Sequence, residues 1–382
     1  MSSASIEEAT EFVLDGTHGS PVRTETGIPV LSAQNVKNGA LDYGTDRYTT
    51  AGEYEAFKKR LPLDRGDVLL TIVGTIGRAA VLEDVRPLVF QRSVAVIRPR
   101  KDLLSPRFLY HVSQSETFQS QLARASNQSS QAGVYLEKLK KVRIPLPPLP
   151  EQRRIAAILD KADELRAKRR AALKKLDELT HSIFLDMFGD PATNPKGWPL
   201  VCLRDLATRK SVQVAPSEID PGTPYIGLEH ISPGGAVEEG HTVSSSGLTS
   251  NKFMFSSGDL LYGKLRPYLA KVAVPQFAGV CSTDILVYAP VMPDATSYLR
   301  AVLLHPSQVK KASSLSTGAN LPRIAPQVLD AFKIPLPPDN LLRQFASNIA
   351  KLDSVREAQK RALIIADALF ASLQHRAFRG EL

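Results

Sequence analysis

Cysteine is scarce in this chain, with only Cys202 and Cys281 among 382 residues. Two cysteines cannot build a disulfide framework or a multi-cysteine zinc site, and such usage is typical of a reducing compartment. No run of about 18 apolar residues occurs, which excludes a membrane-spanning helix. The first residues, MSSASIEEAT, lack the basic and apolar regions of a secretory signal. These absences predict a cytoplasmic protein without a membrane partner.

Motifs of common catalytic sites are also missing. We find neither the glycine-rich cofactor loop of a methyltransferase nor its Asn/Asp-Pro-Pro-aromatic element. The segment GDLLYGKL (258–265) has the glycines and lysine of a P-loop, but Leu265 stands where the magnesium-binding hydroxyl belongs. The seven histidines show no ligand spacing, and no carboxylate cluster suggests a nuclease. We therefore predict no catalytic residues, no metal site and no cofactor bound to this chain.

Positive charge is in mild excess and evenly distributed. The net charge is +9. Lys and Arg outnumber Asp and Glu by three in residues 1–150 and again by three in 191–338. A surplus spread over folded parts, without a basic tail, favours a polyanionic partner held by folded surfaces.

A proline-rich hexapeptide occurs twice with nearly the same sequence. RIPLPP covers 143–148 and KIPLPP covers 333–338, 190 residues later. The prolines force extended backbone, so each copy predicts a stiff boundary between a domain and the helix after it. Pro150 fits the first turn of one helix, and Asp339 or Asn340 can cap the other. An SH3-type ligand is the alternative, which recurrence at the same junction disfavours.

Long heptad patterns follow both hexapeptides. Apolar residues in steps of three and four run from Ile155 to Ile183, interrupted at Arg169, and the register recurs from Phe345 to Leu373, interrupted at Gln359. Each helix has an apolar stripe that needs an apolar partner, so the two helices are expected to pack on each other. We predict an α+β protein with two pseudo-repeated α/β domains separated by two long helices that form an antiparallel coiled coil. The predicted boundaries are 1–148, 149–190, 191–338 and 339–382.

The layout resembles the specificity subunit of type I restriction-modification systems. The resemblance covers essentially the full chain. The segments that carry it are IPLPPLPEQRRIAAILDKADELRAKRR (144–170), IFLDMFGDPATNPKGWPL (183–200), GDVLLTIVGTIGR (66–78) and GDLLYGKLRPYLAKVA (258–273). The chain departs from the family pattern in one respect: no Gly-Trp pair precedes the first domain, whereas one precedes the second. The N-terminus could therefore be shortened.

The resemblance implies a subunit that performs no chemistry. Such a subunit has two target-recognition domains, binds double-stranded DNA, and assembles with methyltransferase and restriction subunits. It directs adenine-N6 methylation to a bipartite site whose spacer the helices set, while S-adenosylmethionine, ATP and magnesium bind the partners. Two alternatives are a fused restriction-modification enzyme and a coiled-coil adaptor that binds proteins only.

Candidate contact residues follow the repeat. Arg and Lys suit phosphates, whereas Arg, Lys, Asn, Gln, Ser and Thr suit base edges. The predicted DNA-binding residues are Thr75, Arg78, Lys58, Lys59, Arg60, Asn127, Gln128, Gln131, Lys264, Arg266, Tyr268, Lys271, Thr317, Asn320 and Arg323. For docking of the methyltransferase subunits we predict Phe184, Phe188, Phe370 and Phe378 at the apolar helix ends.

Overall fold

The computed structural model describes residues 2–126, 133–238 and 240–382. They form two compact units: unit 1 comprises Met1–Arg170 and Arg361–Leu382, and unit 2 comprises Ala171–Lys360. Two long helices, α6 (Leu149–Phe188) and α11 (Asp339–Arg379), each contribute one part to either unit. Each unit therefore combines one α+β domain with a pair of helix segments, which confirms the predicted fold class.

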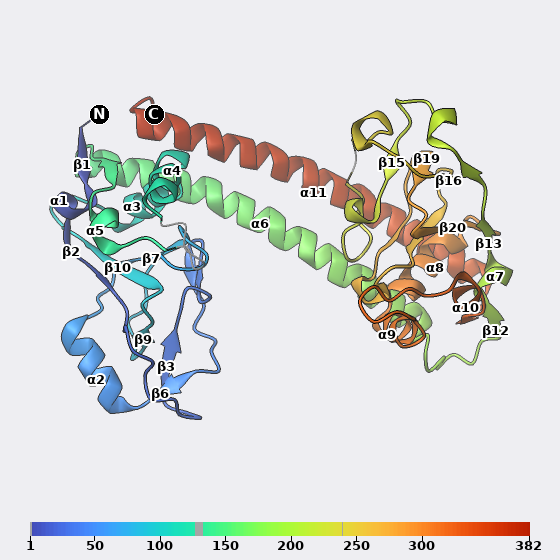
Figure 1. The fold of residues 1–382 in the computed structure, drawn as a ribbon, viewed down its shortest axis with the longest axis horizontal. Coiled ribbons are helices and arrows are strands. Elements are labelled where there is room, and N and C mark those ends of the chain that lie inside the picture. Colours follow the sequence, from blue (N-terminus) through green and yellow to red (C-terminus); the bar gives the residue numbers. More distant parts are fainter. Residues whose placement is uncertain (1, 127–132, 239) are drawn as a thin grey trace. The chain divides into compact units, whose positions relative to one another are not determined.

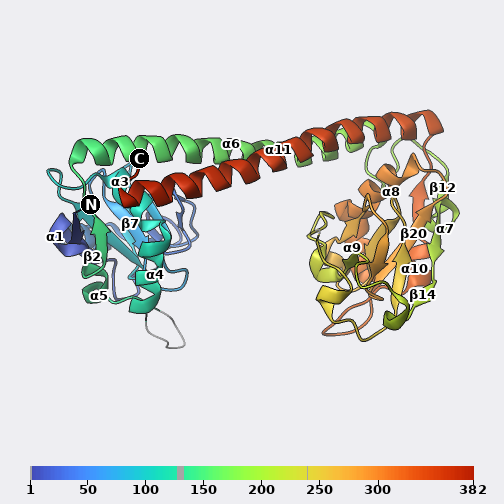
Figure 2. The same ribbon diagram turned by 90° about the horizontal axis from the view of Figure 1, so that it is seen from above.

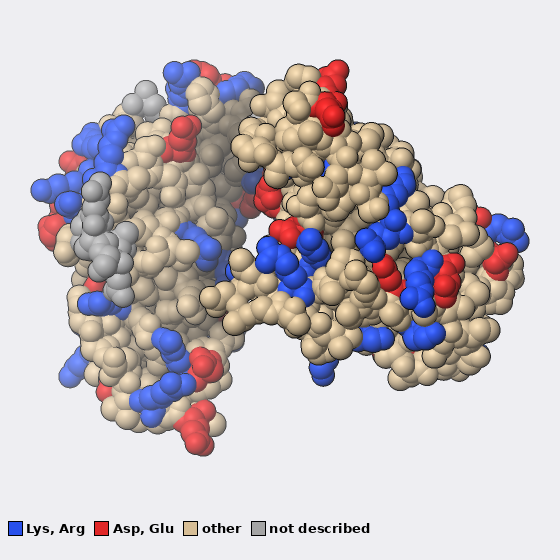
Figure 3. Space-filling view, turned by 45° about the vertical axis from the view of Figure 1, so that its right-hand side comes forward, with Lys and Arg blue, Asp and Glu red and all other residues tan. Residues whose placement is uncertain are grey.

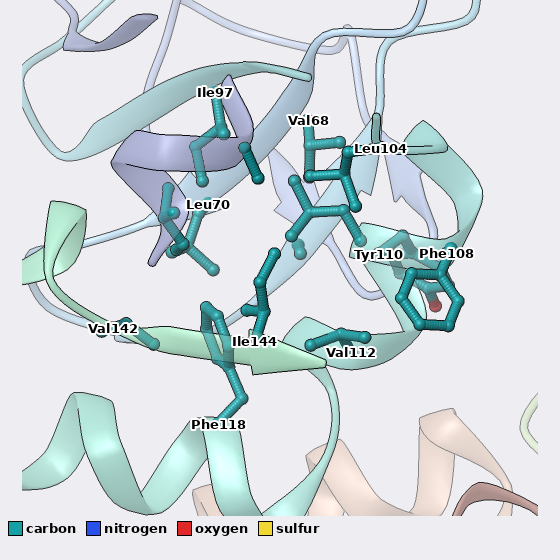
Figure 4. Close-up of a cluster of buried hydrophobic side chains, with 14 of the residues drawn as sticks. Val68, Leu70, Ile97, Leu104, Phe108, Tyr110, Val112, Phe118, Val142 and Ile144 are labelled. Atoms are coloured by element: carbon teal, nitrogen blue, oxygen red, sulfur yellow. The ribbon is translucent and has the colours of Figure 1, made fainter. Parts of the chain in front are cut away.

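A four-stranded antiparallel sheet organises unit 1 (Figure 1). Its strands, in spatial order, are β2 (Thr10–Asp15), β10 (Val94–Pro99), β7 (Val68–Thr71) and β8 (Ala79–Val81). Side chains alternate across a strand, and Val68 and Leu70 join one buried cluster while Leu69 joins another. The sheet is therefore covered on both faces, and Figure 4 shows the cluster that Val68 and Leu70 share with Phe108 and Ile144.

Short helices cover the first face of this sheet. They are α1 (Ile6–Ala9), α3 (Pro106–Ser113), α4 (Glu116–Ala125) and α5 (Leu136–Lys140). The segment 105–124, which reads as one helix in the sequence, is interrupted because the Ser115 hydroxyl accepts a hydrogen bond from the Phe118 amide and begins a new helix.

The second face packs on a small subdomain. It consists of the β6–β3–β9 sheet, the β4–β5 hairpin and α2 (Ala51–Arg60). The strands are β3 (Ile28–Leu31), β4 (Val36–Lys37), β5 (Ala40–Leu41), β6 (Tyr48–Thr49) and β9 (Val89–Phe90). Phe57 of α2 and Phe90 of β9 fill this second cluster.

Unit 2 repeats the arrangement. Its main sheet is β13 (Ala207–Lys210), β20 (Ile285–Pro290), β17 (Leu260–Gly263) and β18 (Val272–Ala273). The second sheet is β14 (Gln213–Val214), β16 (Lys252–Phe255), β19 (Gly279–Cys281) and β15 (Tyr225–Ile226). Leu260 and Tyr262 face one cluster and Leu261 the other, as in unit 1.

Helices again cover the main sheet of unit 2. They are α7 (Leu203–Leu206), α8 (Ala295–Leu304), α9 (Pro306–Ser314) and α10 (Pro326–Asp330). Short 3-10 turns lie at Pro216–Glu218, Leu228–His230, Ser244–Ser246 and Pro267–Leu269. The segment 295–314 reads as one helix in the sequence but breaks at Pro306, which cannot donate the helical hydrogen bond.

Both hexapeptides begin as strands that close their domains. In unit 1, β11 (Arg143–Pro145) pairs with β1 (Ser3–Ser5). In unit 2, β21 (Lys333–Pro335) pairs with β12 (Leu200–Cys202) in the equivalent register. The prolines that follow end each strand directly before α6 or α11, so the repeated peptide joins the edge of a domain to its long helix.

Within each unit the two long helices run antiparallel. In unit 1, Arg166 of α6 pairs with Asp367 of α11 at 2.6 Å, and Arg154 donates to the Leu382 carbonyl. In unit 2, Arg356 of α11 pairs with Asp177 of α6 at 3.1 Å. Figure 2 shows α6 and α11 beside each other in unit 1.

The predicted seam is only partly buried. Ile155 in unit 1 and Phe345 in unit 2 are fully buried because the adjoining domain packs on them. Leu165 and Leu369 in unit 1 remain about half exposed, at 43% and 50%. A pair of helices buries one narrow stripe, and full burial needs a third layer that only the domains provide.

Candidate nucleic-acid interface

In unit 2, two polar loops meet beside the end of β17. The Ile324 amide donates to the Lys264 carbonyl at 3.0 Å, and the Arg266 amide donates to the Pro322 carbonyl at 2.7 Å. Thr317 and Arg323 exchange backbone hydrogen bonds of 3.0 and 2.8 Å, which closes their loop. The structure therefore brings Lys264, Arg266, Thr317 and Arg323 together, although they come from segments some 50 residues apart.

The loop after β17 has unusual backbone geometry. Arg266 and Ala270 adopt φ values of +50°, and they flank the turn Pro267–Leu269. Non-glycine residues rarely adopt this left-handed conformation, and it persists where the surroundings hold it. Arg266 is exposed and forms no ion pair with any residue that the structure describes, and Tyr268 is 54% exposed. This turn presents a free cation and an aromatic ring to solvent.

The other candidates of unit 2 divide into two kinds. Asn320, within the loop, and Thr317, where the loop closes, are exposed and available for contact. Lys271 instead donates from Nζ to the Leu228 carbonyl at 2.6 Å, which ties the loop to the 3-10 turn Leu228–His230 that follows β15. Its ammonium group already has a structural partner within the domain.

Asp284 was not predicted from the sequence. Its carboxylate lies 3.7 Å from the Lys264 ammonium and 3.2 Å from Nε of Arg323. Asp284 follows β19, outside both loop motifs, and no local pattern marks it. The ion pairs arise only when the fold brings the three segments together.

Unit 1 builds the same loop junction. The Val134 amide donates to the Ile72 carbonyl at 2.8 Å, and Val73 forms a bridge with Gly133. The loop from β7 to β8 is closed by Thr71, whose hydroxyl accepts from the Arg78 amide at 2.9 Å. This backbone pattern matches the Ile324–Lys264 contact of unit 2.

Residues of this loop are available for contact. Thr75 is exposed and Arg78 half-buried, and Arg78 forms no ion pair within the described ranges 2–126, 133–238 and 240–382. Gly74 and Gly77 have φ values of +79° and +91°, which only glycine adopts readily, so the turn depends on them. The predicted Asn127, Gln128 and Gln131 lie outside the described residues.

Arg92 is a further cation that sequence reasoning missed. It lies in the turn between β9 and β10, where the Ile72 amide donates to the Ser93 carbonyl at 2.9 Å. The side chain is exposed. The turn therefore borders the loop of Thr75 and Arg78, and a single arginine in a turn gives no sequence signal of this neighbourhood.

The basic residues of α2 belong to a different part of unit 1. Arg60 donates to the Asp15 and Gly16 carbonyls at 2.7 and 2.6 Å, so it ties α2 to the end of β2. Lys58 and Lys59 are exposed on the helix. No hydrogen bond or ion pair among the described residues joins these three to the loop of Thr75 and Arg78.

Charged side chains do not form a continuous basic field on the visible face. Figure 3 shows Lys and Arg scattered over the surface with Asp and Glu between them. On this face, contact with a polyanion would therefore depend on a few placed cations instead of on a broad electrostatic field.

The four predicted docking phenylalanines are engaged inside their own units. Phe184 and Phe188 are 2% and 3% exposed in the core of unit 2, and Phe188 packs edge-on against Phe345 with ring centres 5.2 Å apart. Phe378 packs on Phe108, 5.8 Å away, and the Arg166 guanidinium covers Phe370 at 4.2 Å. These rings fasten the long helices to the domains, and a partner could not reach Phe184 or Phe188 without displacing α11.

A charged cluster performs the same fastening in unit 1. Asp160 of α6 is hydrogen-bonded to the buried His111 of α3 at 2.7 Å and pairs with Arg107. Burial alone would raise the pKa of Asp160, but the hydrogen bonds from His111 and Arg107 lower it below its usual value. Burial raises the pKa of the neighbouring Tyr110 to about 12.

No three His, Cys, Asp or Glu residues among the described residues are grouped so that they could hold a metal ion. None of the described helices is long and apolar enough to cross a membrane.

A family comparison identifies the first domain. Residues 20–175 match the model described as "Type I restriction modification DNA specificity domain". Residues 20–175 are therefore similar to a type I restriction-modification DNA specificity domain. This confirms the resemblance predicted from the sequence, and the matched range includes Thr75, Arg78 and Arg92 of the unit 1 loop junction.

Curated relatives extend the likeness over both units. The chain is 24% identical to the MjaIX specificity subunit of Methanocaldococcus jannaschii, over 93% of this chain and 87% of the relative. It is 29% identical to the EcoDI specificity subunit of Escherichia coli, over 49% of this chain and 43% of the relative. For the EcoBI subunit the identity is also 29%, over 42% and 35%. The match thus spans less than half the length of these two E. coli relatives.

Solved structures share the fold. A type I restriction-modification S subunit from M. genitalium aligns with a TM-score of 0.62 at 13% identity, covering 99% of this chain and 96% of that one. A chain from a study of complex assembly and conformational transition of the type I system aligns with a TM-score of 0.54 at 17% identity, covering 100% and 98%. At these identities the likeness concerns architecture alone.

Proposed function

We propose that this chain is the DNA-reading subunit of a type I restriction-modification complex and recognises a bipartite site, one half-site per domain. The observation that carries the proposal is the duplicated loop junction. Each domain presents polar loops around the same backbone contact, Ile72 with Val134 and Lys264 with Ile324. The DNA specificity domain matched at 20–175 contains most of the first junction and supports its role.

The two domains would read different bases because their loops differ. Unit 1 offers Thr75, Arg78 and Arg92, whereas unit 2 offers Lys264, Arg266 and Arg323. Arginine and lysine donate to the O6 and N7 atoms of guanine in the major groove, and each good pair contributes about 1–3 kcal/mol of discrimination. Two junctions of different chemistry would give an asymmetric site.

The long helices would determine the spacing and recruit the partners. Because α6 leads without interruption from the first domain into the second, its length would set the number of unread base pairs between half-sites. The chain itself would perform no chemistry. S-adenosylmethionine would bind to methyltransferase subunits, which would methylate adenine N6. ATP and magnesium would bind to restriction subunits.

Exposed apolar residues on the helices offer docking surfaces, one in each unit. In unit 1, Ile364 and Ile365 are 68% and 69% exposed on α11. In unit 2, Leu179 and Val355 are 45% and 47% exposed. Apolar side chains left in water on a charged helix mark surfaces for a partner. We propose that these residues, in place of the buried Phe184 and Phe188, contact the methyltransferase subunits.

Binding to DNA can be tested with the full chain alone and with a methyltransferase subunit. Affinity for a randomised duplex pool is measured against salt, and bound sequences are selected and read. The proposal expects a bipartite consensus and an affinity that falls steeply with salt. Salt-independent affinity or a consensus with one block would contradict it, and binding only to the protein partner would favour an adaptor.

Replacing residues 197–338 with the equivalent segment of a related subunit assigns the half-sites. One half of the consensus should change while the other remains. A four-residue insertion in α6 serves as the matched variant, because it lengthens the helix by about 6 Å without touching either loop junction. It should alter the preferred spacer and leave both half-sites intact.

A further inference from the structure

A carboxylate is present in the loop junction of unit 2 at a place where unit 1 has a neutral residue. In unit 1 the Ile72 amide donates to the Ser93 carbonyl, and in unit 2 the Lys264 amide donates to the Asp284 carbonyl, both at 2.9 Å. Ser93 and Asp284 therefore occupy the same place in the repeat. Ser93 is neutral and its hydroxyl accepts from the Ala33 amide, whereas Asp284 places a carboxylate among the loop cations.

The Asp284 carboxylate is shared between both loops of unit 2. Oδ1 lies 3.7 Å from Nζ of Lys264 and 3.2 Å from Nε of Arg323, and Oδ2 lies 3.4 Å from Nη2 of Arg323. The side chains of Asp284 and Lys264 are only 29% and 24% exposed. Arg323 is more exposed, at 43%. Partial burial of Asp284 and Lys264 weakens screening by salt, so the carboxylate favours positions of the two cations beside it.

The carboxylate also opposes a competing use of these cations. Lys and Arg bind the phosphates of DNA whatever its sequence, and this electrostatic attraction supplies most of the non-specific affinity for DNA. A phosphate approaching Lys264 or Arg323 meets the negative charge of Asp284 and has to replace an existing ion pair. Arg266 has no such carboxylate partner among the described residues and remains available for phosphate.

We propose that Asp284 is a specificity-determining positioning residue of the second domain: it fixes Lys264 and Arg323 for one DNA sequence and suppresses their binding to phosphates of any sequence. The inference rests on the proposed reading of DNA by both domains. Ser93 at the equivalent place of unit 1 means that the first half-site lacks this restraint. Discrimination against random DNA is therefore expected to depend more on Asp284 than on any residue of the first junction.

The test uses Asp284→Asn in the full chain. The amide keeps the shape of the carboxylate and removes its charge. Freed cations should raise affinity for a randomised duplex about three- to tenfold at low salt and make the logarithmic salt dependence steeper by about 1–2, since each added phosphate contact contributes about 0.9. Preference for the second half-site should fall at least about tenfold, and preference for the first should not change.

Two further variants separate charge from geometry. Asp294→Asn removes the same charge from an exposed position at the start of α8, where the side chain makes no capping hydrogen bond, and should alter neither the salt slope nor the preference. Asp284→Glu restores the charge with a longer side chain, so it should return random-DNA affinity toward the original value. Melting temperatures of all variants are compared to verify folding.

The salt slope and the preference for each half-site decide the inference. A steeper salt slope together with loss of only the second half-site preference supports the inference. An unchanged slope in Asp284→Asn, or an equal loss of affinity for specific and random DNA, would overturn it. If the unaltered chain itself shows no preference at a second half-site, the proposed function fails, and that result is read from the parent protein before any variant.

Discussion

His111 of α3 and Asp160 of α6 are hydrogen-bonded at 2.7 Å, and the Arg107 guanidinium donates to both oxygens of the same carboxylate. His111 is 1% exposed, so the contact lies where the first domain meets its long helix. Breaking such a contact leaves a buried polar group without a partner, which costs more than the contact itself contributes. The cluster therefore holds the domain to the helix.

Asp160→Asn should destabilise unit 1 by about 1–3 kcal/mol at neutral pH, the usual range for losing hydrogen bonds to a charged group. Since the folded state lowers the pKa of Asp160, the carboxylate's contribution is present above its unfolded value near 3.8 and is lost as the pH falls through the lower folded value. The difference in stability between the parent and the variant should thus disappear below about pH 4. Melting curves from pH 7 to pH 3 measure it.

Asp102→Asn is the matched control for that prediction, because Asp102 is 69% exposed and its ion pair with Arg100 is long, at 3.5 Å. Exposed pairs of this kind contribute little. Equal melting temperatures of Asp160→Asn and the parent at pH 7 would show that the cluster does not fasten the helix.

Phe188→Ala should cost about 3–5 kcal/mol in the free energy of unfolding of unit 2, the usual range for truncating a buried phenylalanine. Phe188 packs on Tyr298, with ring centres 4.8 Å apart, and on Phe345. Urea unfolding of the full chain measures the loss as an earlier transition of one unit. Leu200→Ala, at a side chain that is 53% exposed, should have little effect. A stable Phe188→Ala variant that no longer binds a methyltransferase subunit would instead restore the docking role.

Ile364→Ser with Ile365→Ser should leave the melting temperature almost unchanged, because both side chains are largely exposed. Burial of two isoleucines against a partner would be lost, so affinity for the methyltransferase subunit should fall by at least tenfold. Titration calorimetry or quantitative co-purification measures it. Val291→Ser, also at an exposed apolar residue, is the control. Undiminished binding would remove α11 of unit 1 from the proposed docking surface.

The duplication could be predicted because short sequence patterns mark it in both halves of the chain. Prolines mark the ends of β11 and β21, and heptad steps mark α6 and α11. Other elements carry no such signal. Strand β1 has the sequence Ser-Ala-Ser, without a β-branched or aromatic residue, and becomes a strand only because the hexapeptide pairs with it.

The candidate site was predictable only in part. Glycines and basic residues reveal the loops, but the role of a cation depends on what the fold places beside it. Lys271 and Arg60 are held by carbonyl groups, while Arg266 remains exposed. A heptad pattern likewise shows an apolar stripe without showing what covers it, which is why Phe184 reads as a docking residue and is in fact core.

Arg78→Ala and Arg266→Ala should each weaken DNA binding through one domain alone. Both arginines lie in equivalent loops of separate domains, and neither forms an ion pair with a described residue, so little of the fold depends on them. A base contact would cost about 1–3 kcal/mol and relax one position of the consensus, whereas a phosphate contact would weaken all sequences alike and reduce the salt slope by about 1. Selection from a randomised pool with each variant measures both. Because Arg78 and Arg266 belong to different domains, loss of the same half-site in both variants would contradict independent reading by the two junctions.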